Sequence, residues 1–241
     1  MGTPVRPNGM SSAAAALRYW ERRQEVASNN LANVSTDGFK GQKVFARMVE
    51  GALPAADETT DFSQGTLQTT NNPRDIALDG PGFFVVKTAN GERYSRGGSV
   101  QINESGNLTD SSGNQLLGES GPIRVASRAN ADVGAIQIAR DGMVTIDKAE
   151  VGRLRIETVP AKTTLLAEGS GLFIPPAART RIDPDTRIVR QGALEQSNVT
   201  PIGQMVDMIS IQRAYTAVQK AVTTLDTMRA IATTELARPA N

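Results

Sequence analysis

The stretch LRYWERRQEVASNNLANVSTDGFK, residues 17–40, predicts where one long helix runs and where it ends. Its apolar side chains are spaced three and four residues apart, as on one side of an amphipathic helix, with Gln24 as the one interruption. These side chains are Leu17, Trp20, Ala27, Leu31 and Val34. Ser11 or Ser12 can cap the start of this helix, and the turn-forming residues 35–38 end it.

A second helix is expected near the other end of the chain, over about residues 201–236. Thr200 followed by Pro201 is typical of a helix start, because proline at the first helical position gives up only an amide that has no intrahelical partner. The same three-and-four spacing relates Met208, Ile211, Tyr215, Val218, Val222 and Leu225. At 1.5 Å per residue this helix is about 50 Å long. Since a compact domain of this size needs less, we expect a partner along its length.

Between the two helices the apolar period changes from helical to alternating. Short runs of β-branched and aromatic residues occupy 82–87, 94–95, 99–103, 115–117, 136–138, 143–146, 151–158 and 172–174. Hairpin turn signals occur at 90–91, 105–107, 112–114 and 141–142. Residues 63–191 are therefore predicted to form a mainly antiparallel β domain.

The predicted fold class is α+β, with long N- and C-terminal helices that form a coiled-coil-like layer and a β domain inserted between them. The helical domain takes residues 1–62 and 192–241, with a poorly ordered connector near 39–62 that is rich in glycine, proline and acidic residues. Residues 64–71 and 191–198 share Gln, Gly, Leu and Asn in register. We expect these two segments to be neighbouring strands where the chain enters and leaves the β domain.

Composition argues against most catalytic chemistry. The 241 residues include neither cysteine nor histidine, so thiolate nucleophiles, zinc-thiolate sites and the commonest general base are missing. The 26 basic and 25 acidic residues leave a net charge of +1, which argues against binding nucleic acid or an anionic membrane through a general basic field. Hydrophobic residues make up 39% and aromatic residues 4% of the chain, which predicts a thin or divided core.

Catalysis and metal binding are the weaker alternatives. Asp75, Asp79 and Asp141 could supply an acid and base pair, and residues 183–185 suggest a metal loop, but the loop lacks the spacing and the closing glutamate of a calcium site. We expect no enzyme activity, no catalytic residue, no cofactor and no metal. Because no run reaches the ~18 apolar residues of a membrane span and residues 1–30 lack a signal-peptide core, we expect no membrane insertion and export without a cleaved signal.

Both ends of the chain carry a long motif. Residues 27–40 contain Asn-Leu-Ala-Asn followed by Thr-x-Gly-Phe-Lys, and residues 191–199 read QGALEQSNV and lead into MVDMI and QRAY. With these motifs the chain resembles bacterial flagellar rod and hook proteins. Residues 79–86 (DGPGFFVV) and 93–99 (RYSRGGS) resemble the rod proteins within that family. The chain is more similar to the proximal than to the distal rod branch at residues 118–123 and 151–154.

The resemblance implies a structural subunit of the flagellar rod, the axial shaft of the basal body that crosses the periplasm. Its partners would be copies of itself and other rod proteins in a helical assembly, and the flagellar type III export apparatus. The residues expected to contact other subunits are Leu17, Trp20, Ala27, Asn30, Leu31, Asn33, Val34, Gly38, Phe39, Met208, Ile211, Tyr215, Val218, Val222 and Leu225. Before assembly we expect both termini to be largely disordered or weakly helical, because long helices without packed partners are marginal.

Other interpretations of the same residues stay open at this point. Taken alone, apolar stripes on helices are more often intramolecular core than subunit contacts, and Asn30 to Phe39 can be a turn that stops a helix. Both roles can hold at once. A distal rod or hook-type protein of the same family is the runner-up, and a non-flagellar β-rich binding module with amphipathic arms is the more distant alternative.

Overall fold

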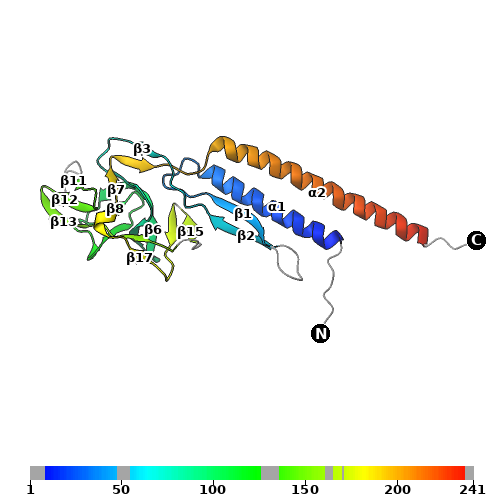
Figure 1. Ribbon diagram of the computed structural model, residues 1–241, viewed down its shortest axis with the longest axis horizontal. Coiled ribbons are helices and arrows are strands. Elements are labelled where there is room, and N and C mark those ends of the chain that lie inside the picture. The colour runs from blue at the N-terminus through cyan, green and yellow to red at the C-terminus, as the bar shows by residue number, and fades with distance from the viewer. Residues whose placement is uncertain (1–8, 48–54, 126–135, 161–164, 170, 237–241) are drawn as a thin grey trace, which may run out of the picture. The chain divides into compact units, whose positions relative to one another are not determined.

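The computed structural model describes residues 9–47, 55–125, 136–160, 165–169 and 171–236, which form two compact units (Figure 1). The helical unit contains the described residues up to Ala32, the hairpin region Gln42–Asp61 and the chain from Thr200 onward. The β unit contains Asn33–Gly41 and Phe62–Val199. The chain therefore passes between the units at four points, after residues 32, 41, 61 and 199. The domain boundaries expected from the sequence had instead grouped residues 33–41 and 192–199 with the helices.

Two helices dominate the helical unit. Helix α1 covers Gly9–Ala32 and starts just before the expected serine caps, and α2 covers Pro201–Leu236, the range expected from Thr200, Pro201 and the apolar spacing. The main-chain amide of Gln204 donates to the carbonyl oxygen of Thr200 at 3.1 Å, which is the first helical hydrogen bond of α2. Within the described residues, neither helix combines the length and apolar character of a membrane span.

A β-hairpin replaces the expected connector. Strands β1 (Gln42–Arg47) and β2 (Ala55–Thr60) pair antiparallel from Gln42↔Thr60 to Arg47↔Ala55. For these residues the prediction of a poorly ordered connector near 39–62 is wrong, and residues 48–54 of that connector lie outside the described part. Charged side chains that suggested a solvated segment pair across the strands instead, as in the 2.7 Å contact between Lys43 Nζ and Asp61 Oδ2.

The β unit is built from short antiparallel strands, as predicted. The strands are β3 (Leu67–Thr69), β4 (Asp75–Leu78), β5 (Phe83–Thr88), β6 (Gly91–Ser95), β7 (Gly97–Ile102), β8 (Leu108–Asp110), β9 (Gln115–Gly118), β10 (Gly121–Pro122), β11 (Ile136–Ile138), β12 (Met143–Ile146), β13 (Ala149–Arg153), β14 (Ile156–Thr158), β15 (Leu166–Gly169), β16 (Leu172–Ile174), β17 (Thr180–Arg181), β18 (Val189–Gln191) and β19 (Ala193–Glu195). The largest sheet runs in the order β15-β16-β6-β5-β9-β8-β7-β4-β18, and separate small sheets join β11-β12-β13 and β19-β3.

The turn signals mark hairpins in this unit. The signals at 90–91, 105–107, 112–114 and 141–142 fall where the chain turns from one strand to its antiparallel partner: β5 to β6, β7 to β8, β8 to β9, and β11 to β12. The expected single strand over residues 151–158 is divided between β13 and β14. The sequence patterns did not predict β4 and β18, which extend the large sheet: β4 pairs with β7, and β18 pairs with β4.

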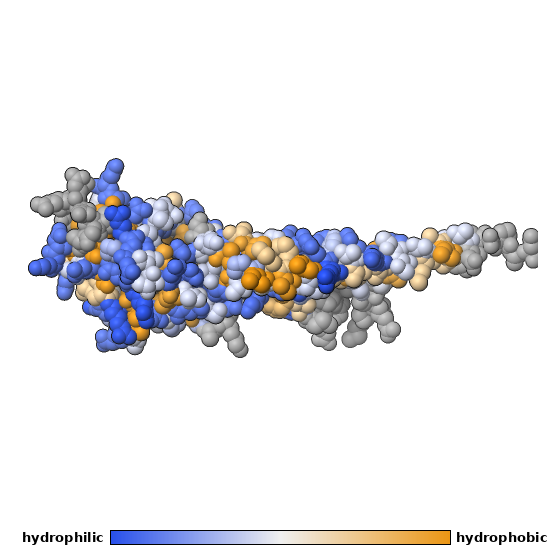
Figure 2. All heavy atoms as spheres, turned by 90° about the horizontal axis from the view of Figure 1, so that it is seen from above, coloured by the Kyte–Doolittle hydropathy of each residue, from blue (hydrophilic) through white to orange (hydrophobic). Residues whose placement is uncertain are grey.

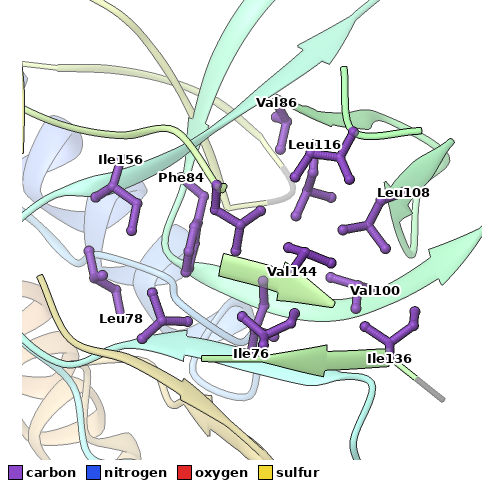
Figure 3. Close-up of a cluster of buried hydrophobic side chains, with 14 of the residues drawn as sticks. Ile76, Leu78, Phe84, Val86, Val100, Leu108, Leu116, Ile136, Val144 and Ile156 are labelled. Carbon is purple, nitrogen blue, oxygen red and sulfur yellow. The ribbon is translucent and has the colours of Figure 1, made fainter. Parts of the chain in front are cut away.

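The apolar core is divided into two clusters, both in the β unit. The larger cluster, drawn in Figure 3, gathers side chains that include Ile76, Phe84, Val86, Leu108 and Ile156. The smaller gathers Phe83, Val85, Tyr94, Leu117, Leu165 and Phe173. Alternate residues of β5 belong to different clusters, because successive side chains of a strand point to opposite faces. The expectation of a divided core therefore agrees with the described structure.

The two repeated segments are neighbours, which confirms that prediction. Strand β3 of the first copy pairs antiparallel with β19 of the second, with Thr69 opposite Ala193 and Leu67 opposite Glu195. The amide of Gln196 also donates to the carbonyl oxygen of Thr66 at 2.9 Å. A Cβ atom on Gly65 would lie 1.9 Å from the carbonyl oxygen of Gln196, so this close pairing requires glycine.

Candidate functional site

The apolar stripes predicted from helical spacing face each other within the helical unit. Each α2 position in the predicted stripe is buried or half-buried, and Ile211 is almost completely covered. Helix α1 is the element with which α2 makes its main contacts among the described residues. From α1, Ala27 is buried and Leu17, Trp20 and Leu31 are half-buried. Tyr215 Oη donates to Glu21 Oε1 at 3.1 Å across the pair. Intramolecular packing of these stripes is thus real, and their contact with other subunits stays a prediction.

A second apolar surface lies on the opposite side of α2. We call it the outer face and define it by Ile202, Met205, Val206 and Ile209, whose exposed fractions are 77%, 53%, 60% and 51%. The 3, 1 and 3 residue steps place all four on one side of the helix, turned away from the stripe that contacts α1. Figure 2 shows hydrophobic surface over the first turns of α2. The stripe predicted from helical spacing did not include this face, although residues 201–211 (PIGQMVDMISI) are rich in large apolar side chains.

Farther along α2, the outer side carries the exposed charged residues Arg213 and Lys220 as well as exposed apolar side chains. Met228 and Ile231 are both more than half exposed farther along the helix. Threonine hydroxyl groups before and after these two residues donate to carbonyl oxygens one turn back in the same helix, as Thr224 Oγ1 does to Lys220 at 2.9 Å and Thr227 Oγ1 to Thr223 at 2.8 Å. Threonines bonded in this way need no hydrogen bond from water or a partner, so they suit a packed helix surface.

Asn30 joins the end of α1 to the start of β1. Its side chain is buried, donates from Nδ2 to the carbonyl oxygen of Gln42 at 2.8 Å and accepts from the amide of Gln42 at 2.9 Å. A longer contact of 3.5 Å reaches Gln204 Oε1 on α2. Arg22, Val26 and Asn30 follow one another at steps of four, and Arg22 pairs with Glu58 of β2. The buried Val26, which the sequence stripe did not include, lies on this side of α1 that contacts the hairpin.

The residues after α1 form a turn that belongs to the β unit. The amide of Thr36 donates to the carbonyl oxygen of Asn33 at 3.0 Å, and Thr36 Oγ1 lies 3.3 Å from Asn33 Oδ1. Val34, which had been assigned to the helical stripe, lies in this turn and is half-buried. The prediction that a turn stops the helix here is confirmed.

Gly38 and Phe39 lie against the last strand of the β unit. The amide of Gly38 donates to the carbonyl oxygen of Glu195 at 2.6 Å, and the carbonyl oxygen of Phe39 accepts from the amide of Asn198 at 3.3 Å. Gly38 has φ +67°, and a Cβ atom there would lie 3.0 Å from the Cβ of Arg96. Both the left-handed backbone and the close approach favour glycine at this position.

A buried charge cluster lies directly beside this segment. Lys40 Nζ donates to Glu195 Oε1 at 2.6 Å, and Arg96 Nε donates to Glu195 Oε2 at 2.8 Å. The side chains are 1%, 1% and 4% exposed for Lys40, Glu195 and Arg96. We call these three residues the junction cluster. Charges buried to this degree persist only when they are paired and hydrogen-bonded, so removal of one member leaves a costly unpaired charge.

Main-chain groups complete the junction cluster. Lys40 Nζ also donates to the carbonyl oxygen of Ser63 at 2.7 Å, and the amide of Gly65 donates to Glu195 Oε1 at 2.9 Å. Arg96 donates to the carbonyl oxygens of Leu78, Gly80 and Gly82. Two cations thus share one carboxylate, and main-chain carbonyl oxygens accept further hydrogen bonds from both cations. Lys40, Arg96 and Glu195 all lie in the quoted motifs, and a charged residue close to glycine in each motif is the signal from which they could have been found.

The carboxylates considered for catalysis have structural partners. Asp75 accepts from Thr70 Oγ1 at 2.7 Å, Asp79 pairs with Arg190 at 2.7 Å and Asp141 pairs with Arg153 at 3.1 Å. In the short loop at residues 183–185, Asp183 Oδ1 accepts from the amide of Asp185. Among the residues that the structure describes, no three acidic side chains gather in a way that could hold a metal ion.

A second charged network lies within the β unit, around Tyr94. Its buried hydroxyl donates to Glu157 Oε2 at 2.8 Å. The pKa of Tyr94 is raised, mainly by burial and next by this hydrogen bond. Burial alone would raise the pKa of Glu92, but Arg155 at 2.9 Å and Arg179 at 2.7 Å donate to that carboxylate and lower its pKa. These ion pairs connect the ends of strands and leave no free acid or base there for chemistry.

Comparisons with known proteins match both ends and the middle of the chain. The family described as "Flagella basal body rod protein" matches residues 10–40, the "Flagellar hook protein FlgE/F/G D1 domain" matches 77–146, and the "Flagellar basal body rod FlgEFG protein C-terminal" matches 190–235. The junction cluster draws one residue from each of these three matched regions.

Individual relatives resemble the chain over most of its length. The flagellar basal-body rod protein FlgF of Escherichia coli is 34% identical over 89% of this chain and 92% of the relative. FlgF of Caulobacter vibrioides is 31% identical over 83% of this chain and 85% of the relative. The rod protein FlgG of Buchnera aphidicola subsp. Schizaphis graminum is 30% identical over 84% of this chain and 90% of the relative.

Proposed function

The chain belongs to the flagellar basal-body rod protein family that includes FlgF and FlgG, and from this premise we propose that it is a structural subunit of the flagellar rod. Its partners are copies of itself and other rod proteins, and it reaches the basal body through the flagellar type III export apparatus. No catalytic step is part of this role.

The observation that carries the assembly proposal is the outer face of α2. Large apolar side chains that stay exposed in the described chain are concentrated in the helical unit: Phe45, Ile202, Met205, Val206, Ile209, Met228 and Ile231, against Leu166 and Ile174 in the β unit. Full burial of such a side chain contributes roughly 1.5–3 kcal/mol. Contiguous exposed apolar surface of this kind is typical of protein interaction sites.

This surface changes which residues are proposed to contact neighbours. The stripe on α2 from Met208 to Leu225 holds α1, and the outer face is the better candidate for contact with other subunits. A helix that is apolar on two opposite sides fits between partners. Because neighbouring subunits in a shaft meet through different surfaces, the contacts are heterologous and extend as a helical filament. The helical unit is therefore proposed as the axial core and the β unit as the outer layer.

Within the family we propose that the chain belongs to the proximal rod branch, FlgF. The FlgF relatives named above are 31% and 34% identical, and the FlgG relative is 30% identical with similar coverage. Residues 118–123 and 151–154, which favoured this branch, form part of β9 to β10 and of β13. The distal rod branch is the alternative.

Gene replacement tests the function. Deletion should abolish swimming and leave cells without hook and filament, and the intact gene should restore both. Cells that swim and carry complete basal bodies after the deletion would rule out the rod function.

Single substitutions test the outer face. Ile209→Lys should abolish swimming, while the unfolding free energy of the purified chain changes by less than about 0.5 kcal/mol because the position is exposed. Leu166→Lys, at the 65% exposed Leu166 of β15, is the matched control and should leave swimming intact. Normal swimming with Ile209→Lys and Met205→Lys combined would remove the outer face from the assembly proposal without touching the rod function.

A further inference from the structure

The β unit is not one continuous piece of chain. Its residues 33–41 are separated in the sequence from residues 62–199 by the hairpin region Gln42–Asp61. Three main-chain or side-chain hydrogen bonds attach the end of this segment: Gly38 to Glu195, Phe39 to Asn198, and the amide of Gly41 to Asn198 Oδ1 at 2.8 Å. We propose that residues 38–41 are a releasable latch, held by the junction cluster, which opens and closes independently of the β core.

The two apolar clusters of the β unit include no latch residue. Neither apolar cluster of the β unit contains a residue from 33–41, and the residues packed against the smaller cluster are Phe62 and Val159. Phe39 is buried outside both clusters. Opening the latch exposes Phe39 but leaves both clusters packed, as expected of a segment that opens locally below the free energy of global unfolding.

The charges of the junction cluster favour one register of the closed latch, and their hydration lowers the cost of opening it. When it opens, Lys40 and Glu195 regain water, which offsets much of the attraction that they lose. Arg96 donates to three main-chain carbonyl oxygens, all outside residues 38–41, so these hydrogen bonds do not depend on the latch. The closed state is nevertheless specific, because only residue 40 in this register places an ammonium group between Glu195 Oε1 and the carbonyl oxygen of Ser63.

The chain crosses between the two units at four points, and closing the latch brings together the β-unit residues next to three of them. Residues 38–41 end just where the chain leaves the β unit for the hairpin. Ser63 and Gly65 lie just after the chain returns to the β unit, and residues 195–198 lie just before it leaves for α2. Asn198 Nδ2 adds a 3.2 Å contact to Ser63. An open latch leaves these segments free of one another, and a closed latch holds them together inside the β unit.

The role of the latch in assembly rests on the proposed function. Its opening and closing in the isolated chain do not depend on that function. A rod subunit must pass an export channel as an extended chain and then become part of a stiff shaft. A joint that closes after the β core has formed meets both requirements. The latch can be tested on the isolated chain, and the rod function is tested separately by gene deletion.

Hydrogen exchange of the full chain, read by mass spectrometry on peptides, tests the latch with Lys40→Met. Exchange in peptides covering 38–41, 63–66 and 195–199 should rise at least about tenfold, and exchange in the β5 peptide 83–88 should stay within about twofold of the wild type. Lys43→Met removes the same charge three residues away, from a side chain that is 70% exposed, and should leave all four peptides unchanged.

A second experiment keeps the proposal testable if Lys40→Met fails to fold. In the wild-type chain under native conditions with low urea, the latch peptides should exchange through an opening with little urea dependence, while the β5 peptide exchanges through global unfolding. Latch and core peptides that exchange at one rate with one urea dependence would overturn the latch. Unchanged protection of the latch peptides in a folded Lys40→Met chain would overturn it as well.

Discussion

At residue scale, the turn between β12 and β13 departs from the usual turn chemistry. Asp147 and Lys148 form a two-residue loop with φ values of +50° and +67°, and Ile146 pairs with Ala149 across it. Both loop positions are left-handed, as in the type of hairpin turn in which Asp-Gly is preferred. The β unit therefore tolerates at Lys148 a backbone conformation that a side chain disfavours.

Lys148→Gly should increase stability. Glycine adopts the left-handed conformation without steric cost, so we expect the free energy of unfolding to rise by about 0.5–1 kcal/mol in urea titrations. Lys148→Ala keeps the Cβ atom and should bring no such gain. Equal effects of the two substitutions would assign the gain to loss of the lysine charge instead of relief at the backbone.

Tyr94 predicts a pH dependence at the alkaline end. Burial and donation to Glu157 raise its pKa in the folded chain above the ~10 of an exposed phenol. Below pH ~10 the hydroxyl is protonated in both states and its full contribution to stability is present. As the pH rises from there toward the raised pKa of the folded chain, the contribution is lost, because Tyr94 ionises first in the unfolded chain.

Urea unfolding of the wild type and Tyr94→Phe at a series of pH values checks this expectation. At pH 8 the variant should be less stable by about 1 kcal/mol, the net contribution of one hydrogen bond. The difference should shrink above pH ~10. A difference that stays constant up to the pH of alkaline denaturation would show that the hydroxyl does not carry the effect.

At element scale, a single amide side chain decides where the hairpin meets helix α1. Asn30 satisfies both main-chain groups of Gln42. Without that contact β1 would begin with an unpaired donor and acceptor next to the helix. The Asn-Leu-Ala-Asn motif therefore has a physical reason at its first residue, whereas Asn33 acts locally in the turn that follows.

Asn30→Ala should destabilise the chain even though alanine is the better helix former. Two half-buried main-chain groups of Gln42 lose their partner, which costs about 1–3 kcal/mol. Gln24→Ala, at an exposed position of the same helix, gives the propensity gain alone and serves as the control. If Asn30→Ala were as stable as Gln24→Ala in urea titrations, the contact with Gln42 would have no net value.

At the scale of the whole molecule, the two units differ in how they are stabilised. Both apolar clusters lie in the β unit, whereas few side chains of the helical unit are fully buried, among them Val26, Ala27 and Ile211. Long helices with so little buried apolar surface depend on partners for their stability. The isolated chain should therefore lose its helical unit first.

The single tryptophan reports this difference, because Trp20 lies in α1. We expect the urea midpoint from Trp20 fluorescence to be lower than the midpoint of the β unit, followed by hydrogen exchange of the β5 peptide. Addition of a rod partner should bring the two midpoints together, since binding to the folded state alone stabilises it. Coincident midpoints in the isolated chain would mean that the units unfold as one.

Features that depend on neighbouring residues were predictable without the structure. The bounds of α2 follow from Thr200, Pro201 and the apolar spacing, and the hairpins follow from turn residues that tolerate left-handed backbone. The pairing of β3 with β19 was predictable because the two segments repeat each other. The hairpin β1 and β2 was missed, because its charged side chains resemble a solvated linker until their partners across the strands are known.

Burial is the property that only the tertiary structure decided. Helical spacing located one apolar side of α2 but not the outer face, because whether Ile202 or Ile209 is covered depends on where α1 lies. Likewise Lys40, Arg96 and Glu195 are separated by more than fifty residues along the chain, and no local pattern brings them together. A charged residue is solvated by default and becomes structural only when distant segments remove water from it and supply its partners. The motifs identified the family, and the packing of segments 38–41, 63–65 and 195–198 turned three of their charged residues into one buried junction.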